Sequence, residues 1–100
     1  MTGTVLDVLD HAPHDWYLLR SAEDYFLDLN CSASWLGYSL LFRLDAGERA
    51  DVLAGGHAAC NALAERLRGT ASPGHPRDLS REYGDAVLDA IARWRKGVEA

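Results

Sequence analysis

A chain of 100 residues has the length of one domain and can bury a hydrophobic core without metals or disulfides. With 48% hydrophobic and 25% charged residues, its composition excludes an intrinsically disordered chain. The net charge of −5 lies in the first thirty residues, which hold six acids and one arginine, because residues 31–100 hold nine acids and nine bases. This asymmetry disfavours nucleic-acid binding and favours a cationic partner, although a solvated acidic face that aids solubility is the simpler explanation.

Membrane and secretion signals are absent from the sequence. No apolar run approaches the roughly 18 residues that a membrane span needs, and the N-terminal segment MTGTVLDVLDHAPHD lacks the basic start of a signal peptide. We therefore expect a soluble, cytoplasmic protein with no membrane association. Cys31 and Cys60 both lie in apolar patterns, and in a reducing compartment each is expected to be a small buried side chain.

The first segment, TVLDVLDHAP, is predicted to form a short helix. Thr4 is a candidate N-cap with Asp7 three residues later, and apolar residues follow at near-helical spacing. Pro13 would end the helix. A β-strand is the alternative for the same residues.

Three strands are predicted next: DWYLLRS at residues 15–21, and two more within YFLDLNCSASWLGYSLLFR at 25–43. A loop at residues 32–35 sets Cys31 opposite Leu36, and a first turn over residues 21–24 adds the preceding strand. This register places apolar side chains together on one buried face: Trp16, Leu18, Tyr25, Leu27, Leu29, Cys31, Leu36, Tyr38, Leu40 and Phe42.

The opposite face of the predicted sheet is also rich in apolar side chains. A monomer does not leave such a patch exposed without reason, so either the N-terminal helix or another chain is expected to cover it. Trp35, at the tip of the second hairpin, is a further candidate contact. The predicted interaction surface consists of Tyr17, Leu19, Phe26, Asp28, Trp35 and Leu41.

A long helix is predicted to begin after Asp45, which forms a capping box with Glu48. Gly69 is expected as its C′ glycine. Gly55 and Gly56 within it cost about 1 kcal/mol each relative to alanine, which indicates close packing on the sheet or a local kink. The apolar stripe of this helix runs through Leu53, Gly56, His57, Cys60, Leu63, Ala64 and Leu67.

The last helix is predicted from about Ser80 to Lys96, after a connection at residues 68–78. Its apolar stripe consists of Tyr83, Val87, Ala90, Ile91, Trp94 and Val98. Basic residues at its C-terminal turn suit the helix dipole. The expected fold of residues 1–100 is one two-layer α+β domain, a three-stranded antiparallel meander packed on the long helix, in the order α-β-β-β-α-α.

No catalytic motif is present: the sequence has no GxSxG, no glycine-rich phosphate loop, no HExxH and no CxxC. The spacings His11-x-x-His14 and His57-x-x-Cys60 fit zinc ligands. A core-filling Cys60 and a His57 that bonds a backbone carbonyl explain the second spacing more simply. We therefore expect no catalytic residue, no metal and no other cofactor.

Two hypotheses for function follow. The first is a small non-enzymatic protein–protein interaction module, either a homo-oligomer formed through the second sheet face or the partner of a cationic protein, with immunity and inhibitor proteins as an analogy only. The alternative is a small-ligand or metal-binding domain, with an enzyme as one form of this hypothesis. Its pocket would lie between the sheet and the long helix, lined by Trp16, Tyr38, His57 and Cys60.

Overall fold

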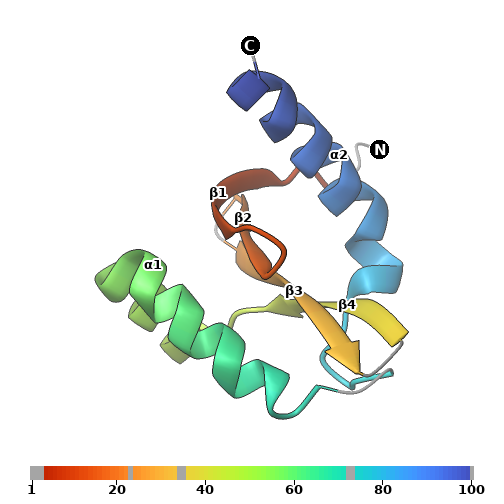
Figure 1. The fold of residues 1–100 in the computed structure, drawn as a ribbon. Helices are drawn as coiled ribbons and strands as arrows, with labels where there is room; N and C mark the ends of the chain where they lie inside the picture. The colour runs from red at the N-terminus through yellow and green to blue at the C-terminus, as the bar shows by residue number, and fades with distance from the viewer. Residues whose placement is uncertain (1–3, 23, 34–35, 72–73, 100) are drawn as a thin grey trace.

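The computed structural model describes residues 4–22, 24–33, 36–71 and 74–99. Its elements are β1 (Asp7–Ala12), β2 (Trp16–Ser21), β3 (Asp24–Ala33), β4 (Leu36–Arg43), α1 (Ala46–Arg68) and α2 (Ser80–Glu99). The strands form one antiparallel sheet in the order β1-β2-β3-β4. α1 and α2 lie on opposite faces of this sheet (Figure 1), so the α+β fold has three layers instead of the predicted two.

The segment predicted as a short N-terminal helix is the edge strand β1. It pairs with β2 so that His11 lies opposite Tyr17, and the register shifts between Val8 and Asp10. This irregularity is a β-bulge, which inserts an extra residue and breaks the strict alternation of a strand. The bulge gave the apolar residues their near-helical spacing, and the strand alternative was the right one.

The β2–β3 hairpin has the predicted register, with Trp16 opposite Leu29 and a tight turn closed by Ser21 and Asp24. The β3–β4 hairpin is shifted by two residues from the prediction, because Cys31 pairs with Tyr38 instead of Leu36. An even shift keeps each side chain on its predicted face, so both face assignments hold.

The core under α1 is a continuous apolar layer. The predicted capping box between Asp45 and Glu48 is present at the start of the helix. Gly56 has φ 64° and ψ −142° and kinks α1, so one helical period does not extend across it. For this reason Leu53, 60% exposed, and His57, also exposed, are not on the buried face of the helix, although the predicted stripe included them. The core contains Trp16, Leu18, Leu27, Leu29, Cys31, Leu40, Phe42, Leu44, Val52, Cys60, Leu63, Ala64 and Leu67.

The end of α1 also differs from the prediction in one detail. Gly69 is the C-cap, but it has right-handed helical angles, φ −63° and ψ −21°, instead of a left-handed conformation. Its N–H donates to the Glu65 carbonyl at 3.1 Å. The glycine therefore closes the helix as a continuation of its last turn.

The second sheet face is covered by α2, not by an N-terminal helix or another chain. Leu19, Phe26 and Leu41 are each at most 1% exposed and pack in one cluster with Val87 and Ala90. The expectation that this apolar patch would be free for a partner is therefore wrong for these three residues. The stripe of α2 supplies the cover, as its spacing predicted for a buried helix face.

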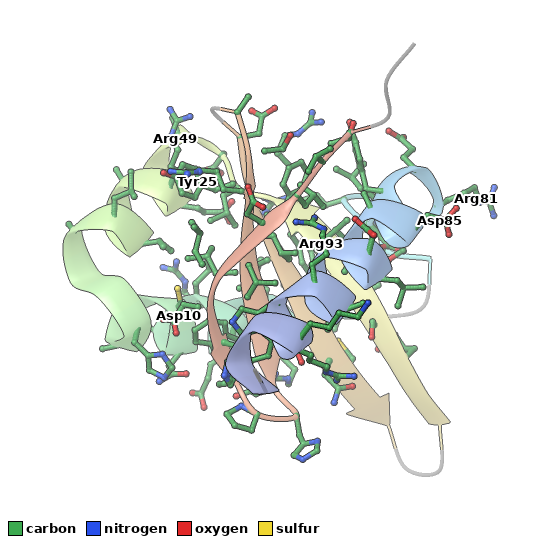
Figure 2. The ribbon with its side chains drawn as sticks, turned by 90° about the horizontal axis from the view of Figure 1, so that it is seen from above. Asp10, Tyr25, Arg49, Arg81, Asp85 and Arg93 are labelled. Carbon is green, nitrogen blue, oxygen red and sulfur yellow. The ribbon has the colours of Figure 1, made fainter. Side chains whose placement is uncertain are left out.

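Two anchors fix α2 diagonally across the sheet. At its start, the Asp78 carboxylate accepts hydrogen bonds from the Leu41 N–H of β4 at 2.9 Å and from the Ser80 N–H at 3.0 Å. Near its other end, the Arg93 guanidinium donates to the Leu6 carbonyl, just before β1, at 2.6 Å. Figure 2 shows Arg93 lying over β1, while Arg81 points away from the strands. Because β4 and β1 are opposite edges of the sheet, α2 crosses all four strands and leaves corners beside it uncovered.

Candidate functional site

A groove lies beside α2 on the second face of the sheet. One hollow of about 300 Å³ lies between the β1–β2 turn, the sheet and the C-terminal half of α2. A second, of about 270 Å³, lies between β4 and the N-terminal half of α2. Asp28 and Ser39 line both hollows, so the two lie next to each other at these residues, and together they are called the groove.

Asp28 occupies the junction of the groove. It lies on β3, opposite Tyr17 of β2 and Leu41 of β4, and its side chain points to the second face. Burial, with a smaller contribution from the negative charge of Asp78, raises the pKa of Asp28 to about 6. Reduced hydration makes the charged form costly, so a cation at this position would stabilise the carboxylate.

Three aromatic rings form one wall of the first hollow. The Trp94 ring of α2 meets the His11 ring of β1 edge to face, with centroids 4.4 Å apart, and the Tyr17 ring of β2 at 5.8 Å and 81°. Such perpendicular contacts fix the rings against one another. The wall therefore comes from three elements, β1, β2 and α2.

A positive charge lies at the outer side of the same hollow. The Arg95 guanidinium of α2 donates to the Tyr17 hydroxyl at 3.5 Å. Tyr17 is also the cross-strand neighbour of Asp28. The first hollow is thus lined by both a carboxylate and a guanidinium.

The β1–β2 turn forms the rim of the first hollow. His14 has φ 63°, a left-handed conformation that is uncommon outside glycine. The turn is held in place because Asn30 Nδ2 donates to the His14 carbonyl at 2.8 Å and Arg68 pairs with the Asp15 carboxylate. These bonds fix the position of His14 and leave its ring on the lining of the hollow.

The predicted interaction surface divides into three groups in the structure. Tyr17 and Asp28 line the groove, and Leu41 forms part of its floor. Leu19 and Phe26 are buried beneath α2. Trp35 lies outside the described residues.

The pocket predicted between the sheet and α1 is filled by packed side chains. The His57 ring lies 5.0 Å from the Trp16 ring, and its Nδ1 is 2.9 Å from the Asp10 carboxylate. Burial, with a smaller contribution from Asp10, raises the pKa of the Cys60 thiol to about 11, which keeps it protonated at neutral pH. Tyr38 packs at the margin of the same core, while Trp16 also reaches the first hollow of the groove.

The spacings that suggested zinc ligands do not converge. His11 and His14 line the groove on one sheet face, whereas His57 and Cys60 belong to the α1 side. In the part of the chain that the structure describes, no three histidine, cysteine or acidic side chains form a group that could hold a metal ion.

Sequence reasoning missed most of the groove, although it contained one usable signal. Asp28, Asn30 and Ser39 are polar residues at inward-pointing positions of an otherwise apolar face, and such positions mark a place that the core does not fill. Among the groove residues that were not predicted as site residues are His11, His14, Asn30, Ser39, Trp94 and Arg95.

No family model, curated protein or solved structure matches the chain. Neither helix, over its described residues, is long and apolar enough to cross a membrane.

Proposed function

We propose that this protein is a non-enzymatic binding module whose groove accepts a positively charged group of its ligand or partner. The observation that supports this best is Asp28, a poorly hydrated carboxyl group at the point where the two hollows meet. A bound ammonium or guanidinium group would replace the water that burial removes.

The surroundings of Asp28 support the same ligand chemistry. Trp94 and Tyr17 present aromatic rings to the hollow, and a cation against such rings gains about 0.5–2 kcal/mol. The acidic first third of the chain adds a long-range field that attracts cations. Self-association through Leu19, Phe26 and Leu41 is not part of this proposal, because α2 covers those side chains.

The test is an NMR titration of the ¹⁵N-labelled protein with 3-methylbutylammonium chloride and, separately, with the neutral 3-methylbutanol. We expect the ammonium compound to shift the amides of residues around Asp28 and Ser39, and the alcohol to bind much more weakly. A short lysine-containing peptide, titrated in the same way, distinguishes a protein side chain from a small amine as the source of the charge.

Asp28→Asn is the decisive variant, because it keeps the shape of the side chain and removes its charge. It should abolish the response to the ammonium compound. Asp24→Asn, which alters an exposed carboxylate on the same strand, is the matched control and should leave binding unchanged. Equal binding of alcohol and amine, or undiminished binding by Asp28→Asn, would refute the proposal.

A further inference from the structure

We propose that the ligand of the groove is a free α-amino acid with an apolar side chain. This inference rests on the proposed function, since Asp28 would hold the ammonium group in both. It adds two parts to the proposed site: Arg95 would bind the carboxylate of the ligand, and the second hollow would hold its apolar side chain.

The first hollow carries opposite charges, and this favours a zwitterion over a simple cation. Arg95 and Asp28 both line this hollow. The Tyr17 hydroxyl accepts a hydrogen bond from Arg95, and Tyr17 is the cross-strand neighbour of Asp28. A simple cation would gain from Asp28 and be repelled by Arg95. A ligand with adjacent ammonium and carboxylate groups satisfies both charges at once.

Several other ionic side chains near the two helices have partners. Arg77 binds Glu48 at 2.6 Å, Arg93 binds Asp89 at 3.0 Å, and Arg68 is paired with Asp15. These pairs hold the fold together. Asp28 and Arg95 differ from these ion pairs because both line the same hollow, Asp28 from β3 and Arg95 from α2. The hollow has room for a small molecule.

The second hollow supplies the apolar half of the site. Its walls include Leu41, Val87, Leu88 and Ile91, of which Leu88 is 69% exposed. It begins at Asp28 and Ser39, where the ammonium group would sit. The side chain attached to the same α-carbon would therefore enter it directly, and its volume of about 270 Å³ suits a leucine-sized or phenylalanine-sized group.

The experiment compares L-leucine, L-leucinamide and 4-methylpentanoate by calorimetry and NMR titration. Leucinamide lacks the carboxylate, and 4-methylpentanoate lacks the ammonium group. We expect leucine to bind about threefold to tenfold more tightly than leucinamide, because the carboxylate adds a charge-assisted hydrogen bond to an exposed arginine. The 4-methylpentanoate anion should bind most weakly.

Arg95→Gln should remove the difference between leucine and leucinamide while leaving leucinamide binding intact. Lys96→Gln, which removes the next cation along α2 without altering the lining of the groove, is the matched control and should keep the difference. For the apolar hollow, Leu88→Ser should weaken leucine binding and leave glycine binding unchanged. Both altered positions are exposed, and an unchanged amide spectrum would verify the fold of each variant.

The outcomes separate the two proposals. If leucinamide binds as tightly as leucine and Arg95→Gln changes nothing, the amino-acid assignment is wrong while the cation site stands. If the lysine-containing peptide binds and leucine does not, the ligand is a protein segment and the assignment is again wrong. If none of leucine, leucinamide and 3-methylbutylammonium binds, both the amino-acid assignment and the proposed function are wrong.

Discussion

The two faces of the sheet are both covered by a helix, yet one is closed and the other holds a groove. Under α1, the inward-pointing side chains of the central strands are apolar and form one buried layer. Under α2, apolar Leu19, Phe26 and Leu41 are buried, whereas Asp28 and Ser39 line the groove. The difference shows that a groove can form where a cover is incomplete, without any change in the architecture of the sheet.

The physical cause lies in how each helix is attached. α1 bends at Gly56, and buried residues on both sides of the bend, Val52 and Cys60, belong to the same core. α2 is fixed at the β4 edge by Asp78 and at the β1 edge by Arg93, and so crosses the sheet diagonally. Burial opposes ionisation of Asp78, but hydrogen bonds from Leu41 and Ser80 outweigh it and lower its pKa, so the first anchor is charged at neutral pH.

The largest expected effect is the loss of stability when a buried ring is removed from either face of the sheet. It tests whether both faces are covered by their helices in solution. Phe26→Ala and Phe42→Ala remove rings of equal size from the α2 and α1 sides, and both rings are at most 1% exposed. We expect each to lower the free energy of unfolding by about 3–5 kcal/mol in urea denaturation. A much smaller loss for Phe26→Ala alone would mean that α2 leaves its face open in solution.

The second effect concerns Asp28 and pH. The pKa of Asp28 is raised from 3.8 to about 6, which means that the folded state binds the proton more tightly than the unfolded state does. The stability that this protonation contributes is therefore complete below about pH 3.8 and is lost as the pH rises through 6. The asparagine in Asp28→Asn does not titrate, so the variant does not lose this stability as the pH rises. Its stability relative to the wild type should therefore rise by about 3 kcal/mol between pH 3.5 and pH 7.5 in urea titrations. A constant difference across this range would show that Asp28 is well hydrated and would weaken the case for the groove.

A third, smaller effect tests the kink that lets α1 close its face. Gly56→Ala forces a side chain into a backbone conformation that strongly favours glycine, and we expect a loss of about 1–3 kcal/mol in thermal or urea unfolding. Gly97→Ala in α2 is the control, because open space surrounds its added methyl group and its φ is not positive. It should be neutral or slightly stabilising, by up to about 1 kcal/mol.

The smallest effect separates a groove residue from a core residue. Leu88→Ser should change the free energy of unfolding by less than about 0.5 kcal/mol, because the side chain is 69% exposed. Leu63→Ala, on the buried side of α1, should cost about 2–5 kcal/mol. Similar losses for both would place Leu88 in a core and contradict its role as a groove wall.

Much of the fold could be predicted from local pattern. The alternation in β2, β3 and β4 gave the correct face for each side chain even where the β3–β4 register was off by two, because only an odd shift exchanges faces. The capping box at Asp45 and the stripe of α2 are also local signals. β1 was mistaken for a helix because its bulge disturbs that alternation.

The groove could be predicted only in fragments. Tyr17 and Asp28 were singled out for their place on the second face, but Trp94 and Arg95 lie some 65 to 80 residues away and reach them only because α2 crosses the sheet. The predicted pocket near His57 and Cys60 failed because Gly56 turns the helix and places His57 outside the buried stripe.

The sequence by itself determined which side chains share a face, where the long helix begins and that both sides of the sheet needed a cover, because these depend on residue periodicity and on hydrogen bonds between near neighbours. Only the tertiary structure decided that α2 provides the second cover and that it leaves Asp28 beside an aromatic wall. That outcome depends on where the Asp78 carboxylate finds its donor and the Arg93 guanidinium its acceptor, at opposite edges of the sheet, in contacts that span 37 and 87 residues of chain.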